Sequence, residues 1–288
     1  GMFPNYPIHS ITNGVHAATW TSPPVQELLD ERIPDWRTQN LSLRYAVAIP
    51  LEEVQRAHLE AKHLLLEEVE RRTGRLLSHD AFTIGFARRA AEYKRADLLF
   101  TDLERLRRIA REQGALQILF AGKAHPQDGP GKALIRRVFE AAAQLDGPVP
   151  VFYLEEHDMT LGRLLCAGVD LWLNTPKKPH EASGTSGMKA ALNGVPSLSV
   201  LDGWWIEGHV EGVTGWSVGE HWDTGPDRAA EAASLYDKLE KVIVPLYYKD
   251  PAGFAKVMRS SMSINGSFFN AQRMVTQYLE SSYRLDGR

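Results

Sequence analysis

The sequence contains a single cysteine, Cys166, and no long apolar run. One cysteine excludes an internal disulfide, and a membrane helix needs about 20 consecutive apolar residues. None of the ten histidines has the spacing to other ligands that a metal site requires. The GxGxxG pattern of dinucleotide sites and the Walker loop are also missing. We therefore expect a cytoplasmic protein with no metal site and no nucleotide motif of these two kinds.

Neither sign of charge is in large excess. The chain has 33 Lys and Arg residues against 36 Asp and Glu residues, for a net charge of −3. This balance gives no electrostatic reason to expect nucleic acid or an anionic membrane as a partner. The hydrophobic fraction of 43% is enough for a substantial core, and 288 residues suit one large domain or two ordinary ones.

The chain is predicted to have three parts. Residues 1–79 form an irregular lead-in that ends in a long amphipathic helix over 51–73. Residues 80–225 alternate short apolar runs with helical segments, and residues 226–288 are helical. Strands are predicted at 82–87, 117–121, 150–154, 170–173 and 196–201. Helices are predicted between them at 96–112, 131–144, 160–167 and 188–193, and after them at 228–244, 251–262 and 268–283.

Continuous apolar strands between helices indicate an α/β fold with a Rossmann-like, doubly wound parallel sheet that is buried on both faces. In such sheets ligands bind beyond the carboxyl ends of the strands. The polar loops 88–95, 122–129 and 174–187 all follow predicted strands. We therefore expect these three loops to face one crevice.

The loop before the predicted helix 188–193 has the features of an anion site. Glu181 and Lys189 flank a Gly/Ser/Thr-rich stretch, 183–187. A flexible loop that opens a helix presents free backbone N–H groups, and the helix dipole adds positive potential there. Lys189 either balances the charge of a bound anion or holds a group covalently.

The loop after the first strand carries a cluster of cations with Tyr93 among them: Arg88, Arg89, Lys94 and Arg95. This cluster indicates a phosphate clamp, and the alternative is a solvated charge run. Lys123 follows the second strand, where an ordinary surface lysine is the simpler interpretation. Trp204 and Trp205 suit a sugar site or core packing about equally. Cys166 lies in an apolar run and is expected in the core.

Four stretches, 11–20, 84–100, 121–126 and 181–194, occur in the order found in the α-glucan phosphorylases, the family of glycogen, starch and maltodextrin phosphorylase. The chain resembles the C-terminal, cofactor-binding half of this family, and most of all its short bacterial and archaeal branch. The resemblance implies a single domain, 1–288, which is the C-terminal half of a glycosyltransferase-B architecture. It also implies retaining phosphorolysis of an α-1,4-glucan to glucose 1-phosphate.

The resemblance implies pyridoxal 5′-phosphate as cofactor, held by Lys189 as a Schiff base. The other implied cofactor contacts are Trp20 near the ring and, around the phosphate, Arg88, Lys94, Gly184, Thr185 and Ser186. The implied catalytic residues are Arg89, Lys94 and Lys189. The implied substrate contacts are Asn13, Glu181, Ser183 and Gly184 for glucose and Arg89 for phosphate. The chain departs from the family at Glu156-His157, where an Asn-Tyr pair is usual.

The implied partners are the glucan, inorganic phosphate and the N-terminal half of the enzyme, without which we expect poor activity. The last predicted helix should pack on that half, which would leave an apolar stripe of Phe268, Phe269, Met274 and Tyr278 exposed in this chain. A homo-oligomer is compatible with the sequence, which does not fix the oligomeric state.

Two other functions share part of this pattern. Nucleotide-sugar transferases such as bacterial glycogen synthase resemble the chain in the clamp of Arg89 and Lys94. Their Glu-x7-Glu motif grips the ribose, whereas here Lys189 stands eight positions after Glu181. A lysine cannot accept hydrogen bonds from ribose hydroxyls, so this position favours the phosphorylase. The third hypothesis is a non-catalytic remnant that binds glucan or phosphate.

Overall fold

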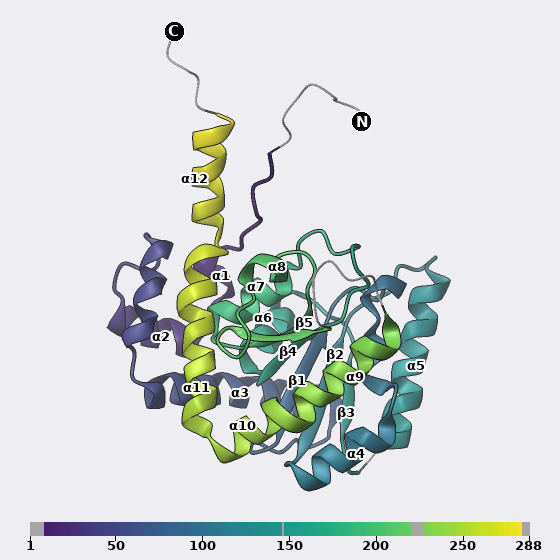
Figure 1. Cartoon of the computed structure of the whole chain (residues 1–288). Helices are drawn as coiled ribbons and strands as arrows, with labels where there is room; N and C mark the ends of the chain where they lie inside the picture. Colours follow the sequence, from purple (N-terminus) through teal and green to yellow (C-terminus); the bar gives the residue numbers. More distant parts are fainter. Residues whose placement is uncertain (1–8, 146, 220–226, 284–288) are drawn as a thin grey trace, which may run out of the picture.

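The computed structural model describes residues 9–145, 147–219 and 227–283, which build a sandwich of helices around one parallel sheet (Figure 1). The sheet has six strands in the order β3-β2-β1-β4-β5-β6, all parallel. The strands are β1 (Phe82–Ala87), β2 (Leu116–Ala121), β3 (Val151–Leu154), β4 (Leu171–Asn174), β5 (Ser197–Val200) and β6 (Gly215–Val218). The predicted doubly wound α/β fold is confirmed.

The helices also follow the predicted order, with breaks at three places. They are α1 (Ala17–Trp20), α2 (Pro23–Arg32), α3 (Leu51–Thr73), α4 (Leu103–Glu112), α5 (Gly129–Leu145), α6 (Met159–Gly168), α7 (Thr185–Leu192), α8 (Trp205–Gly208), α9 (Arg228–Lys238), α10 (Val244–Lys249), α11 (Pro251–Ser260) and α12 (Ala271–Ser281). The helix predicted over 96–112 is instead a 3-10 turn, Ala96–Phe100, followed by α4, which Asp102 caps. π-helical turns interrupt the segments predicted over 228–244 and 251–262.

Alternation along the strands divides the core between the two faces of the sheet. In β2, Ile118 and Phe120 join the core that α4, α5 and α9 cover, whereas Leu119 and Ala121 join the core beneath α3 and α6. Side chains in a strand alternate between faces, so a strand that is apolar at every position must be covered on both. The amphipathic helix α3 fills this role with Leu65 and Val69.

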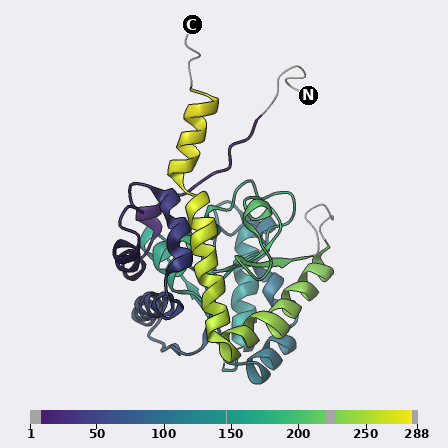
Figure 2. The same cartoon turned by 60° about the vertical axis from the view of Figure 1, so that its left-hand side comes forward.

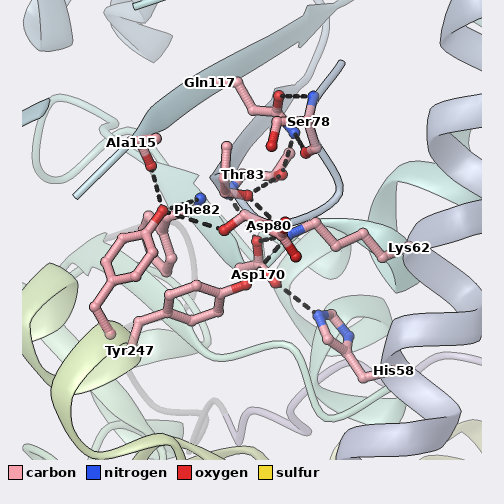
Figure 3. A network of polar contacts seen from close by, with 12 residues as sticks. His58, Lys62, Ser78, Asp80, Phe82, Thr83, Ala115, Gln117, Asp170 and Tyr247 are labelled. Atoms are coloured by element: carbon pink, nitrogen blue, oxygen red, sulfur yellow. Dashed lines mark hydrogen bonds and ion pairs between the residues drawn. The ribbon is translucent and has the colours of Figure 1, made fainter. Parts of the chain in front are cut away.

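The amino end of the sheet is closed by a buried ion cluster around Asp170, which precedes β4 (Figure 3). Asp170 Oδ2 lies 2.7 Å from Lys62 Nζ, and Oδ1 lies 2.9 Å from His58 Nε2. The backbone N–H of Thr83 also donates to Asp170, at 2.7 Å. Burial alone would raise the pKa of Asp170, but attraction to Lys62 and the bond from His58 outweigh it and lower that pKa. The charge on Asp170 therefore belongs to the folded state.

The segment before α1 lies against the segment before α12. Val15 pairs with Asn270 in a single parallel bridge, and α12 projects from the body beside the N-terminal segment (Figures 1 and 2). No residue of α12 is buried. The predicted apolar stripe is wrong for Phe269, which is 3% exposed and packs edge-to-face on Trp204. Among the described residues, no helix is both long and apolar enough to span a bilayer.

Candidate active site

An ion cluster at the carboxyl end of the sheet forms the centre of the candidate site. Arg88 follows β1, and its guanidinium bonds to Asn174, the last residue of β4. Glu181 Oε2 lies 2.7 Å from Arg88 Nη2 and 2.5 Å from Lys94 Nζ. Strands β1 and β4 are neighbours in the sheet, so their loops meet at the crossover edge of the doubly wound fold. The sequence correctly predicted that these two loops share a crevice.

Backbone contacts fix the two loops to each other. Thr175 Oγ1 donates to the carbonyl oxygens of Lys94 and Arg95, each at 3.1 Å. The N–H of Lys177 donates to the carbonyl of Tyr93 at 2.7 Å. The loops that carry Lys94 and Glu181 are therefore held together by these hydrogen bonds and do not depend on the ion pair alone.

Glu181 also borders a cleft of about 580 Å³. Of the predicted sugar-binding residues, Asn13 and Ser183 line the same cleft, together with Met274 and Tyr278 from α12. Asp202 was not predicted as a site residue. It follows the fifth strand, and ligands bind beyond the carboxyl ends of such strands, so the sequence could have indicated it. Its carboxylate accepts the N–H of Glu181 at 2.9 Å and holds that residue at the cleft wall.

The glycine-rich loop packs tightly on Trp204 at the start of α7. Gly184 caps the helix with a left-handed φ of 87°, a conformation that favours glycine. A Cβ on Gly187 would lie 2.8 Å from the Trp204 ring. Trp204 is 3% exposed and Trp205 is fully buried, so both tryptophans are core residues and not a sugar platform. They hold the helix start in place behind the site.

The hydroxyl of Ser183 is buried and has no hydrogen-bond partner among the described residues. Beside it, the first N–H groups of α7 have no partner within the helix, as at every helix start. Buried polar groups are rarely left unsatisfied in folded proteins. The loop therefore has spare donors that suit an anion with several oxygens.

Lys189 lies one turn into α7, and its Nζ is 3.5 Å from the centroid of the Trp20 ring. Within the described ranges, no carboxylate forms an ion pair with it. Burial lowers the pKa of Lys189, which raises the fraction of neutral, nucleophilic amine. Asn193 at the end of α7 fixes Trp20 through a 2.8 Å bond to the Trp20 carbonyl. Cys166 is buried as predicted, and burial raises its thiol pKa to about 12, so the thiol stays protonated.

The predicted four-cation clamp is wrong for one member. Arg95 is buried and points to another part of the fold, where its Nη1 lies 2.5 Å from Glu231. Arg89 is exposed at the loop and forms no ion pair with any residue that the structure describes. Lys123 pairs with Glu156 at 3.1 Å, and both side chains are exposed. Thr185 and Ser186 form the first turn of α7.

Comparison with known proteins agrees with this arrangement. The profile of the carbohydrate phosphorylase family matches residues 2–214. The chain belongs to this family. The match spans every predicted site residue, from Asn13 to Lys189, and ends before β6.

Relatives of this chain are found in archaea and bacteria. The maltodextrin phosphorylase of Thermococcus litoralis is 42% identical over 297 aligned positions, which cover 96% of this chain and 36% of the relative. The glycogen phosphorylase of Aquifex aeolicus is 37% identical, with 96% of this chain and 44% of the relative covered. That of Mycobacterium tuberculosis is 35% identical, with 96% and 35% covered. The chain thus spans less than half the length of these three relatives.

Proposed function

We propose that this chain is the cofactor-binding part of an α-glucan phosphorylase, which transfers a glucosyl unit from an α-1,4-glucan to inorganic phosphate and retains the α-configuration. The observation that carries the proposal is Lys189. It is a half-buried lysine with a lowered pKa, stacked on Trp20 and close to a helix start that suits an anion. A lysine used only for charge balance would gain more from a nearby carboxylate.

The residues around Lys189 suit pyridoxal 5′-phosphate. The Lys189 amine would hold the aldehyde carbon, and Trp20 would pack near the ring. The spare donors of Ser183 and of the first turn of α7, Thr185 and Ser186, match a phosphate group. Bound there, the cofactor would supply a phosphate that exchanges a proton with the substrate phosphate.

The chain's own side chains would manage the charge of two phosphates held close together. Arg88 and Lys94 already converge on one carboxylate oxygen of Glu181, so the same spot can hold an anion. Arg89 has an exposed guanidinium on the same loop and would bind the substrate phosphate. Fixed cations in a partly buried site stabilise developing negative charge without reorganisation. Glu181 and Asn13, on the walls of the cleft, would accept and donate hydrogen bonds to glucose hydroxyls.

We further propose that a separate N-terminal part completes the site. The 580 Å³ cleft is bounded by α12, whose outer side chains are unusually apolar for a solvated helix. Val275 is 49% exposed and Leu279 55% exposed. Contiguous apolar exposure of this kind marks an interaction surface. The single buried thiol of Cys166 suits a reducing compartment, and we place the enzyme in the cytoplasm.

Complementation tests the function directly. The chain is loaded with pyridoxal 5′-phosphate and mixed with a separately expressed N-terminal part of a phosphorylase relative, then assayed for glucose 1-phosphate from maltodextrin and phosphate. We expect activity with the wild-type chain and none with Lys189→Ala, whereas Lys123→Ala should retain it. Equal activity of the Lys189→Ala mixture would overturn the assignment. Binding of ADP-glucose by calorimetry would instead favour the nucleotide-sugar transferase.

A further inference from the structure

A second pocket is lined in part by the neighbours of Lys94 and Glu181 on the same two loops. Its volume is about 520 Å³, within the range of small-molecule sites. It is lined by Glu92, Tyr93, Arg95, Arg137, Lys177, His180 and Arg228. These residues come from two loops and from helices α5 and α9. The proposed function uses none of them.

The guanidinium groups at this pocket are only partly neutralised. Arg137 Nε and Arg228 Nη2 share one oxygen of Asp97, at 3.0 and 3.2 Å. A guanidinium has five N–H donors. Within the described ranges, neither arginine side chain has a hydrogen-bond or ion-pair partner other than Asp97. The two arginine side chains are 47% and 45% exposed, so their remaining donors are open to a ligand.

The other cations add to this excess. Arg95 is neutralised by Glu231, and its Nε and Nη2 also donate to the carbonyls of Thr175 and Pro176. Lys177 is exposed and its side chain contacts no carboxylate in the part of the chain that the structure describes. The positive charges of the pocket still exceed the negative charges of Glu92, Asp97 and the Glu231 that neutralises Arg95. A guanidinium presents a planar fork of N–H donors that fits phosphate oxygens, and here Arg137 and Arg228 converge on one point, a pair that we call the arginine fork.

Aromatic rings line one side of the same pocket. The Tyr93 and His180 rings lie 6.1 Å apart at an angle of 60°. His180 is the residue before Glu181, and Tyr93 the residue before Lys94, whose Nζ lies 4.5 Å from the centroid of the Tyr93 ring. A ligand that moved these rings would therefore act directly on the Lys94–Glu181 pair.

We propose that this pocket is a second anion site, which binds a small phosphate-bearing ligand and reports its presence to the Glu181 cluster through loops 92–95 and 175–181. The arginine fork recognises the phosphoryl oxygens, and Lys177 closes the site from the loop. The site does not require Lys189 and stands apart from the proposed function.

Calorimetric titration of the chain with pyrophosphate tests this site. Because the candidate active site also attracts anions, the titration is run in the Arg89→Ala background, which lacks the proposed phosphate ligand there, as well as in the wild type. The double variant Arg137→Ala/Arg228→Ala should weaken binding to the second site by about tenfold or more in both backgrounds. The matched control Arg111→Ala/Arg136→Ala removes the same charge from exposed positions on α4 and α5 that do not line the pocket, and should leave the affinity unchanged.

Far-UV circular dichroism and the melting temperature establish that the variants are folded. Lys177→Ala, an exposed loop substitution, serves as a milder second variant and should weaken binding by a smaller factor. Ring proton resonances of His180 should shift with the same pyrophosphate dependence. Affinity that is equal in wild type, pocket double variant and control, or His180 resonances that do not move at saturation, overturns the proposal.

Discussion

The two ends of the sheet carry the same kind of ion cluster in two different settings. At the amino end, Asp170 is bound by Lys62 and His58. At the carboxyl end, Glu181 is bound by Arg88 and Lys94. Both clusters place one carboxylate between two nitrogen-bearing side chains from a segment that is distant from it in the sequence. They differ in what surrounds them.

Both charged groups of the Asp170–Lys62 pair have further protein partners. Lys62 Nζ donates to the carbonyl of Ala81 at 2.8 Å and lies 3.2 Å from the Tyr247 hydroxyl, and both Lys62 and the Asp170 carboxylate are fully buried (Figure 3). Glu181 instead lies on the wall of a 580 Å³ cleft. A closed cluster contributes to stability, whereas a cluster next to a cleft can exchange its internal partner for a ligand. A structural ion cluster thus differs from a functional one less in the residues that form it than in whether a cleft lies beside it.

The largest expected effect on stability comes from the closed cluster. Asp170→Asn leaves Lys62 buried without its counter-ion, and we expect a loss of about 3–5 kcal/mol in the free energy of unfolding, measured in urea. Glu104→Gln, which breaks an exposed pair with Arg107, is the control and should hardly move the midpoint. Equal midpoints for Asp170→Asn and wild type would contradict the structural role.

The same cluster predicts the acid limit of stability. The folded-state pKa of Asp170 lies below the usual 3.8. The ionised carboxylate therefore makes its full contribution to the free energy of unfolding above pH 3.8. It is lost as the pH falls through the lower, folded-state pKa. The gap in unfolding free energy between wild type and Asp170→Asn should therefore be constant at neutral pH and shrink below pH 3.8.

An intermediate effect is expected at the wall behind the functional cluster. Gly187→Ala places a Cβ 2.8 Å from the buried Trp204 ring, and such overpacking costs about 1–3 kcal/mol. Gly129→Ala, where a Cβ meets nothing within 4 Å, is the matched control. Thermal unfolding measures both. An unchanged melting temperature for Gly187→Ala would show that the helix start can move away from Trp204.

The Glu181 cluster is also buried, with side chains 6–7% exposed, but it borders a cleft and should respond to a ligand more than to loss of its carboxylate. Glu181→Gln frees Arg88 and Lys94 while leaving the pairing of the two loops intact, so we expect a loss of only about 1–2 kcal/mol. Inorganic phosphate should then raise the melting temperature of Glu181→Gln by more than it raises that of wild type. Glu156→Gln, which breaks the exposed pair with Lys123, should show the wild-type response. If Glu181→Gln lowered the free energy of unfolding more than Asp170→Asn does, the contrast between the two clusters would be wrong.

The smallest effect concerns Lys189 without cofactor. Its pKa is lowered from 10.5, so between the folded and unfolded values the unfolded state binds more protons and wild-type stability rises with pH. Lys189→Met removes this penalty and should be more stable at pH 7 by less than about 1 kcal/mol, because attraction to Trp20 offsets part of it. The advantage should vanish near pH 10.5.

Local patterns in the sequence were enough to predict most of the sheet. Five strands were predicted to within one residue at each end because each is a short apolar run between helical segments. Strand β6 was missed because Gly215–Val218 begins with a glycine and lies among glycines and polar residues, so it does not form a continuous apolar run. Arg88, Lys94 and Glu181 were found together because parallel strands deliver their following loops to one edge.

The remaining features depend on contacts between distant segments. Nothing near Arg95 in the sequence indicates that Glu231 neutralises it, and Phe269 was placed on an exposed stripe because its contact with Trp204 spans the chain. The same holds for the fork of Arg137 and Arg228, which two separate helices bring to Asp97.

The most direct test of the central claim is to trap the cofactor on the chain. The protein is incubated with pyridoxal 5′-phosphate, reduced with borohydride, digested and mapped by mass spectrometry. We predict a stoichiometric pyridoxyl group on Lys189 and none on Lys94 or Lys123, with Lys189→Arg left unlabelled at substoichiometric cofactor. Labelling spread over exposed lysines, or an unlabelled Lys189 in cofactor-saturated protein, would contradict the account.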